Sequence, residues 1–298
     1  MSDRLLSMLS LPQSTLSALT REGYETVQDL ATMTPELLAE GLNIPLTSSQ
    51  AVFSATQAPR AVPMTQSAAS MLLDGGLKRG HILEISGPPG SAKETLAANI
   101  VRSFVSTGDE VLFIDMQNMM SPATLNRILH KSYVPPEHRK LVHHLNLHSL
   151  PDLMIFLNNL PYYLGTHPKI TLLVLNSLSF PFQSAVGLGI PTRNALLEKV
   201  RQTLSKTCAS SNLTIVITSQ LATKMLNPDG SAANFDTGSR AVIVPQLGNT
   251  YLPSGRTSRV IVVPQTRSTG VLRLLLSPTH VQGRRREESY EKIGGAIQ

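Results

Sequence analysis

The feature that most constrains the fold of this 298-residue chain is a Gly- and Pro-rich loop between an apolar run and a helix-like stretch. The apolar run covers residues 81–86, and the helix-like stretch covers residues 93–104. A loop in this position directs successive backbone N–H groups and a helix N-terminus at one point, which is how proteins bind phosphate. The sequence therefore predicts a phosphate-binding loop in an α/β fold. The predicted phosphate-contacting residues are Gly87, Pro88, Pro89, Gly90, Ser91, Ala92, Lys93, Glu94 and Thr95.

Two positions of this loop depart from the pattern G-x-x-x-x-G-K-[ST]. Ala92 replaces the second glycine, and its Cβ would crowd the loop if the backbone φ there were positive. Glu94 replaces the hydroxyl residue that would hold Mg²⁺. A carboxylate about 4 Å from a phosphate oxygen is repelled by about 4 kcal/mol at an effective dielectric of 20, unless Mg²⁺ or an outward rotamer intervenes. Because Lys93 is retained, we expect a real phosphate-binding loop, and because Ala92 and Glu94 depart from the pattern, we expect its binding to be impaired. The simpler alternative is a Gly/Pro turn before a helix.

The segment from residue 70 onward alternates strand-like and helix-like runs, which predicts a mostly parallel sheet covered on both faces. The predicted strands are residues 81–86, 111–115, 145–148, 172–175, 213–219, 258–263 and 271–276. The last two, joined by residues 264–270, are expected to form a hairpin added at one edge. The predicted helices are residues 93–104, 122–129, 151–164 and 192–207.

The first part of the chain has a different pattern. Leucines at helical spacing, interrupted by Gly and Pro, predict a small helical domain over residues 1–55. One helix is expected to begin with Thr34 as its N-cap and Pro35 at its first position. Residues 56–69 are predicted to be a linker, and residues 70–298 form the core domain.

Composition excludes several classes of protein. Cys208 is the only cysteine, so an intrachain disulfide and a cysteine-based zinc site are impossible, and a reducing compartment is expected. No secretion signal and no apolar run of about 18 residues is present, so we expect a soluble intracellular protein without a membrane partner. The net charge of +6 permits a polyanionic partner without requiring one. No metal site is predicted at the five histidines that cluster in the middle of the sequence, which are His130, His138, His143, His144 and His148.

Three further segments, in order after the phosphate loop, carry a resemblance. They are Ile114-Asp115-x-Gln117, residues 172–176, and Ile217-Thr218-Ser219-Gln220. Their order and spacing resemble the RecA-like core of the eukaryotic Rad-type recombinase paralogues. Residues 173–183 and 218–225 are similar to the C-type branch of that family in particular, as in a divergent fungal-type member.

This resemblance implies a RecA-like fold, ATP with Mg²⁺ as cofactors, and a nuclear role in DNA repair by homologous recombination. Gln117 falls on the catalytic glutamate, and a neutral amide cannot accept the proton of the attacking water. Asn176 falls where an aspartate would hold the metal shell, and it lacks the charge for a hard cation. Gln220 matches the glutamine that senses the terminal phosphate. Because Glu94, Gln117 and Asn176 depart together, we expect this chain's own hydrolysis to be weak or absent.

The resemblance also implies two DNA-facing loops. Residues 183–191 contain no Lys or Arg, so a strong grip on phosphates is not expected there. Residues 222–246 are expected to form a long Gly/Ser/Asn-rich loop with Lys224 and Arg240 as DNA-binding candidates, the alternative being ordinary solvated charge. The run Arg284-Arg285-Arg286 is expected to be a solvated loop. The family's Phe-x-x-Ala oligomerisation signal is out of register at Phe53.

These features favour a recombination-mediator paralogue that binds ATP weakly, binds single-stranded or junction DNA, and assembles with other RecA-like recombinase paralogues. One alternative is an active DNA-dependent ATPase in which Glu94 supplies a metal ligand. A second alternative is a nucleotide-free scaffold subunit. Preferred DNA structure and partner identity do not follow from the sequence.

Overall fold

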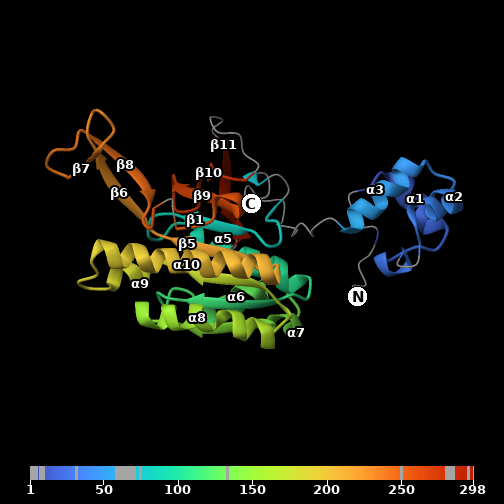
Figure 1. The fold of residues 1–298 in the computed structure, drawn as a ribbon, viewed down its shortest axis with the longest axis horizontal. Coiled ribbons are helices and arrows are strands. Elements are labelled where there is room, and N and C mark those ends of the chain that lie inside the picture. Colours follow the sequence, from blue (N-terminus) through green and yellow to red (C-terminus); the bar gives the residue numbers. More distant parts are fainter. Residues whose placement is uncertain are drawn as a thin grey trace. The chain divides into compact units, whose positions relative to one another are not determined.

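A computed structural model describes residues 6, 11–30, 33–57, 72–73, 76–131, 134–248, 251–278, 286–293 and 296–297. The chain divides into two compact units, Met1–Arg60 and Ala61–Gln298 (Figure 1). The linker predicted at residues 56–69 lies mostly outside the described residues.

The first unit is helical and has its own small core. Its elements are α1 (Gln13–Arg21), the 3-10 turn η2 (Val27–Leu30), α2 (Pro35–Leu42) and α3 (Leu46–Gln57). Helix α2 begins with the expected cap, because the Thr34 hydroxyl accepts a hydrogen bond from the Leu37 N–H at 3.4 Å. Leu6, which precedes α1, packs with buried apolar side chains of these elements, and they are Leu19, Leu30, Leu38, Leu42 and Val52.

Within the described residues, the second unit contains a nine-stranded sheet in the order β12-β11-β10-β9-β1-β5-β4-β2-β3. The six strands from β9 to β3 are parallel, and β10, β11 and β12 are antiparallel additions. The strands are β1 (Ile82–Ser86), β2 (Glu110–Asp115), β3 (Val142–Asn146), β4 (Ile170–Asn176), β5 (Thr214–Ser219), β9 (Thr257–Pro264), β10 (Thr269–Leu276), β11 (Arg286–Ile293) and β12 (Ala296–Ile297). The predicted parallel sheet is therefore confirmed, with β4 in its interior.

Helices cover both faces of this sheet. Val174 of β4 packs in the cluster that contains α5 (Lys93–Ser106) and α6 (Pro122–Lys131). Its neighbours Leu173 and Leu175 pack in the opposite cluster, with α8 (Leu150–Thr166), α9 (Ser179–Ser184) and α10 (Ile190–Ser211). A short helix, α7 (Pro136–Arg139), precedes β3. This alternation of apolar side chains between two helical layers is typical of a buried parallel sheet. In the parts of the chain that the structure describes, no helix is both long and apolar enough to cross a bilayer.

Two predicted strands differ in place or context. β3 begins earlier than the predicted residues 145–148, because pairing with β2 sets Val142 opposite Val111 and Asn146 opposite Asp115. β9 and β10 form the predicted antiparallel hairpin, but β11 and β12 continue the sheet beyond it. Arg286, expected in a solvated loop, opens β11 instead, whereas Arg284 and Arg285 lie outside the described residues.

The prediction of a long loop at residues 222–246 is wrong. This segment forms a separate three-stranded ribbon in the order β7-β6-β8, which extends away from the main sheet (Figure 1). Its strands are β6 (Leu221–Leu226), β7 (Ala232–Ala233) and β8 (Arg240–Pro245). The Gly, Asn and Ser residues that suggested a loop are concentrated in the turns between these strands.

Candidate phosphate-loop site

The predicted phosphate loop follows the carboxyl end of β1, between the neighbouring strands β5 and β9. Its first residue, Gly87, donates its N–H to the Ser219 carbonyl at 3.2 Å, and the Ser91 N–H bonds the Pro88 carbonyl at 3.2 Å. A Cβ on Gly87 would lie 2.5 Å from the Ser91 Oγ and 3.2 Å from the Val262 Cβ. A side chain at this position would therefore crowd the Ser91 hydroxyl within the loop and the Val262 side chain of β9.

The two other small residues of the loop have distinct conformations. Gly90 has a φ of +75°, a region that L side chains rarely adopt. Ala92 has a φ of −80° and is buried, so its methyl group causes no backbone strain. The replacement of the second glycine therefore leaves the loop geometry intact.

The ammonium group of Lys93, the retained lysine, makes a hydrogen bond and an ion pair within the protein. Its Nζ lies 3.0 Å from the Pro88 carbonyl oxygen and 2.9 Å from the Glu94 Oε1. The Lys93 side chain is 0% exposed, and that of Glu94 is 15% exposed. Burying an ammonium group is costly unless it is paired and hydrogen-bonded, and these two contacts supply that compensation. Glu94 thus turns toward Lys93. Thr95, the last predicted contact, follows in the first turn of α5 and is half-buried.

Asn176, at the end of β4, is held by structural hydrogen bonds. Its Nδ2 donates to the Asp115 Oδ1 at 3.1 Å, and its Oδ1 accepts from the Thr218 hydroxyl at 2.8 Å. The same hydroxyl accepts the Ser177 N–H at 2.7 Å. Both ends of the Asn176 amide are therefore used to join β2, β4 and β5 at their carboxyl ends.

Gln117 lies in the turn that follows β2. The Asp115 carboxylate holds this turn by accepting the N–H groups of Gln117 at 3.2 Å and Met120 at 2.7 Å. In the sheet, β5 and β4 separate β2 from the loop-bearing strand β1. The structure thus brings Gln220, which directly follows β5, next to the phosphate loop, whereas Gln117 lies farther along the sheet edge.

Several buried polar atoms at this edge have no hydrogen-bond partner among the described residues. They are the Ser91 Oγ, the Ser177 Oγ and the Gln220 Oε1, which follow the adjacent strands β1, β4 and β5. Buried polar groups are normally satisfied, so a polar ligand at this edge would complete them. The loop backbone and these atoms fit a phosphate-bearing ligand. The Glu94 carboxylate is paired with Lys93 and the Asn176 amide with Asp115 and Thr218, while Gln117 carries a neutral amide, which cannot act as a general base.

A buried ion pair beneath the loop was not anticipated from the sequence. Glu84, in the middle of β1, is fully buried and lies 3.2 Å from the Arg259 Nε. Its carboxylate also accepts hydrogen bonds from the Tyr251 and Ser219 hydroxyls. Burial raises the pKa of Glu84 above its ordinary value, while Arg259 and the two hydroxyls oppose this shift. The available signal was a carboxylate within an otherwise apolar run, which indicates a buried partner.

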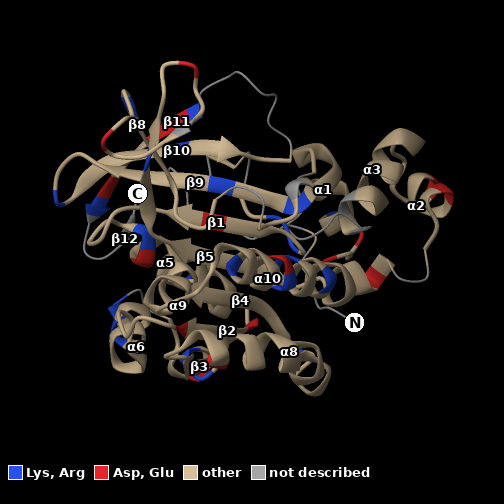
Figure 2. Cartoon of the chain, turned by 60° about the vertical axis from the view of Figure 1, so that its left-hand side comes forward, with Lys and Arg blue, Asp and Glu red and all other residues tan. Residues whose placement is uncertain are grey.

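The two DNA candidates lie on the ribbon. Lys224 on β6 pairs with Val242, and Leu226 pairs with Arg240, so Lys224 and Arg240 share one face of the ribbon. Both are exposed, but the turns beyond them carry Asp229 and Asp236. Figure 2 shows basic and acidic residues interspersed over the second unit. The ribbon therefore offers a small basic face and has no net charge.

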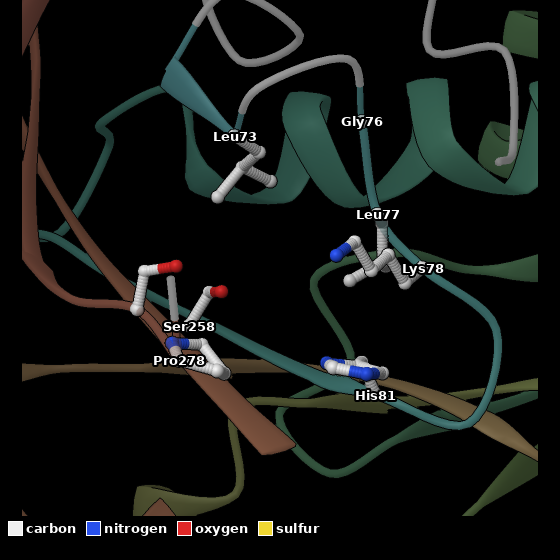
Figure 3. A pocket seen from close by; sticks show the side chains of 8 residues that line it. Leu73, Gly76, Leu77, Lys78, His81, Ser258 and Pro278 are labelled. Atoms are coloured by element: carbon white, nitrogen blue, oxygen red, sulfur yellow. The ribbon is translucent and has the colours of Figure 1, made fainter. Parts of the chain in front are cut away.

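A small hollow near the start of β1 is separate from this site. It is lined by Lys78, His81 and Ser258 (Figure 3). The other lining residues precede β1 or follow β10, and they are Leu73, Gly76, Leu77, Ser277 and Pro278. Burial, aided by Lys78 and Arg256, lowers the pKa of His81. The hollow has a volume of about 20 Å³, and it lies at the end of β1 opposite the phosphate loop. It is too small for a nucleotide.

The histidines near β3 make pairwise contacts. His143 Nε2 lies 3.2 Å from the Glu110 carboxylate, and His144 Nε2 lies 2.9 Å from the Met120 carbonyl oxygen. Across the described ranges, no group of three or more His, Cys, Asp and Glu side chains is placed to hold a metal ion.

Comparison with known proteins identifies relatives of this chain. No protein-family model matches it. It is 25% identical over 158 residues to the DNA repair and recombination protein RadB of Methanosphaera stadtmanae, covering 53% of this chain and 66% of RadB. It is 21% identical over 213 residues to the DNA repair protein RAD51 homolog 3 of Cricetulus griseus, covering 62% and 55%. It is 31% identical over 160 residues to the DNA repair protein rhp55 of Schizosaccharomyces pombe, covering 48% and 45%. The matched regions thus span about half to two thirds of these relatives' own length.

The sheet, the loop and these relatives define a RecA-like α/β protein of the phosphate-loop type. More particularly, the chain is a divergent relative of the RecA/Rad51-family recombinase paralogues.

Proposed function

We propose that this chain is a mediator subunit of DNA repair and recombination in the nucleus, which assembles with other RecA-like paralogues and hydrolyses ATP weakly or not at all. The observation that carries the proposal is a RecA-like core whose catalytic positions are engaged in internal contacts. Lys93 forms an ion pair with Glu94, and the Asn176 side chain donates a hydrogen bond to Asp115. A subunit with this arrangement keeps the shape needed for assembly without the groups needed for turnover.

A groove at the edge of the sheet supports the partner assignment. β3 is the last strand in the sheet order, and a groove of about 640 Å³ lies between β3 and α8. Leu145 and Ile155 line it and are 41% and 61% exposed. The outer edge of β3 pairs with no other strand among the described residues, and it lies beside this groove. Such an edge suits an extended segment of another chain, which would add main-chain hydrogen bonds to side-chain contacts.

The occupant we propose for this groove is an extended segment of a RecA-like partner. Phe53, the residue nearest to the family's oligomerisation signal, packs partly buried against the helical core of the first unit. It is therefore a poor donor for a neighbour's groove. This combination favours a chain that accepts a partner and does not polymerise with itself.

The ribbon supports DNA binding as the second part of the proposal. Lys224 and Arg240 can contact two backbone phosphates from one face, while the acidic turns beyond them disfavour a longer phosphate track. We therefore propose modest affinity for single-stranded or junction DNA by the chain alone, increased when a partner contributes its own contacts.

For nucleotide, we propose weak ATP binding in which the loop backbone contacts the phosphates. A second candidate is a scaffold that binds no nucleotide, and the Lys93–Glu94 contact favours it. Titration with a fluorescent ATP analogue, with and without Mg²⁺, separates these two candidates. Saturable binding supports the first candidate and its absence supports the second.

The partner proposal is tested with purified RecA-like paralogues mixed with this chain in analytical ultracentrifugation. A one-to-one complex is expected, and Leu145→Asp or Ile155→Asp should disrupt it because both place charge in the groove. Tyr162→Asp is the matched control, since Tyr162 is 79% exposed on the same helix as Ile155 but does not line the groove. Complexes that are insensitive to both groove variants would contradict this docking site.

A further inference from the structure

We infer that Glu94 is the resident anion of the phosphate loop, and that a nucleotide must displace its carboxylate from Lys93 before a phosphate can bind there. This inference rests on the proposed role of the loop as a weak nucleotide site. It also explains why nucleotide binding is weak, because the Glu94 carboxylate competes with the phosphate of the nucleotide for Lys93.

The contacts of the Lys93 ammonium group leave little room for another arrangement. The Glu94 carboxylate and the Pro88 carbonyl lie 2.9 Å and 3.0 Å from Nζ, and the Lys93 side chain is 0% exposed. The ammonium group is therefore enclosed by protein atoms in this state. An incoming phosphate can therefore approach Nζ only if Glu94 or the loop moves.

The pairing of Lys93 with Glu94 depends on the start of the helix. Adjacent residues do not face each other on a regular helix surface, so such pairs are normally absent. Lys93 and Glu94 are the first two residues of α5, where the lysine bonds the carbonyl of Pro88, five residues earlier in the loop. A carboxylate in the first turn of a helix also interacts favourably with the helix dipole. Glu94 thus supplies negative charge at the two features that would otherwise attract phosphate, the lysine and the helix N-terminus.

Displacement has an electrostatic consequence for nucleotide affinity. Glu94 is only 15% exposed, so a phosphate that takes its place leaves a poorly solvated carboxylate beside a second anion. Replacing the carboxylate by an amide of the same shape removes both the competition and the repulsion. We therefore expect Glu94→Gln to bind nucleotide at least about tenfold more tightly than the natural chain, which corresponds to about 1.4 kcal/mol.

The first test needs no nucleotide. Unfolding midpoints in urea are compared for the natural chain, Lys93→Met, Glu94→Gln and the double variant. Lys93→Met should lower the midpoint because Glu94 loses its partner, and adding Glu94→Gln should restore part of the loss. The control cycle uses Arg201 and Glu198, an exposed pair 2.7 Å apart on α10, for which little coupling is expected. Coupling for Lys93 and Glu94 no larger than in the control cycle would overturn the inference.

The second test measures the affinity of a fluorescent ADP analogue without Mg²⁺. Glu94→Gln should bind it at least about tenfold more tightly, and adding Lys93→Met should remove the gain. Glu94→Thr, a smaller neutral side chain, is the second variant if Glu94→Gln does not fold. Equal affinity of the natural chain and both neutral variants would overturn the inference. Partner binding by the natural chain is measured separately, so failure of the mediator proposal is distinguished from failure of this one.

Discussion

The side-chain amide of Asn176 donates a hydrogen bond to the carboxylate of Asp115, with 3.1 Å between Nδ2 and Oδ1. Both residues are buried at the carboxyl ends of neighbouring strands. An aspartate at position 176 would place a second carboxylate against the first. The departure from an acidic residue at the end of β4 therefore has a structural reason besides its consequence for metal binding.

We predict that Asn176→Asp destabilises the protein. The substitution replaces a donor by a buried anion next to Asp115, which should lower the free energy of unfolding by about 3 kcal/mol. Protonation of one carboxyl group removes the repulsion, so the deficit should shrink on acidification. Urea unfolding at neutral and acidic pH measures both effects.

The control is the exchanged pair, Asp115→Asn with Asn176→Asp. It retains one carboxylate and one amide, so it should be more stable than Asn176→Asp alone. If Asn176→Asp is as stable as the natural chain at neutral pH, the Asp115 contact does not explain the asparagine.

The same comparison shows what sequence patterns could and could not predict at the site. The loop, its strand and its helix were predicted because glycines, the lysine and the apolar run lie together in the sequence. The contact of Asn176 with Asp115 joins residues 61 positions apart, and it depends on β2 and β4 being neighbours in the sheet. The Lys93–Glu94 pair was missed for another reason, since adjacent helical residues normally diverge.

A second prediction concerns the buried pair of Glu84 and Arg259. Arg259→Met removes the main attraction that opposes the burial of the Glu84 carboxylate, so the free energy of unfolding at neutral pH should fall by about 3–5 kcal/mol. The pKa of Glu84 is already raised above its ordinary value of 4.5, and this variant raises it further. Stability from a raised carboxyl pKa is present at low pH and is lost as the pH rises through the folded-state pKa.

The Arg259→Met variant should therefore regain part of its lost stability as the pH falls from neutral toward 4.5. Thermal unfolding across this range measures it. Arg273→Met is the control, because Arg273 is 44% exposed and pairs with the exposed Glu287. A deficit in Arg259→Met that is constant with pH would contradict a change in the protonation of Glu84 over this range.

The third prediction concerns DNA. Lys224→Ala with Arg240→Ala should weaken binding to a single-stranded oligonucleotide and reduce the slope of log K against log salt by about 1.4, at about 0.7 per lost phosphate contact. Fluorescence anisotropy at several salt concentrations measures the slope. Lys199→Ala with Lys206→Ala is the matched control, because both lysines are exposed on α10. An unchanged slope in the ribbon variant would remove these two residues from the interface.

The fourth prediction concerns turnover. Phosphate release with Mg²⁺, ATP and single-stranded DNA should stay far below the order of 1 per second that is usual for enzymes. Lys93→Ala should leave this background unchanged, because no hydrolysis depends on the loop. Turnover near 1 per second that disappears in Lys93→Ala would instead support the active ATPase alternative.

Outside the site, apolar elements could be predicted from the sequence and polar ones could not. The core strands were predicted because their apolar runs are nearly continuous, as burial on both faces requires. β11 was missed because its sequence, Arg-Glu-Glu-Ser-Tyr-Glu-Lys-Ile, is mostly charged. The pairing of Arg273 with Glu287 across β10 and β11 shows how charges can satisfy each other at such an edge. The ribbon was missed because its Gly, Asn and Ser residues are typical of turns and outweighed the strand signal of its three short strands.

The mediator role is tested most directly by the affinity of a purified RecA-like paralogue for single-stranded DNA, measured by anisotropy with and without this chain. We predict a complex that binds DNA more tightly than either protein alone. Leu145→Asp should abolish the increase, and Tyr162→Asp should preserve it. A chain that stays monomeric beside every RecA-like paralogue of its organism, and changes the DNA affinity of none, would contradict the mediator role.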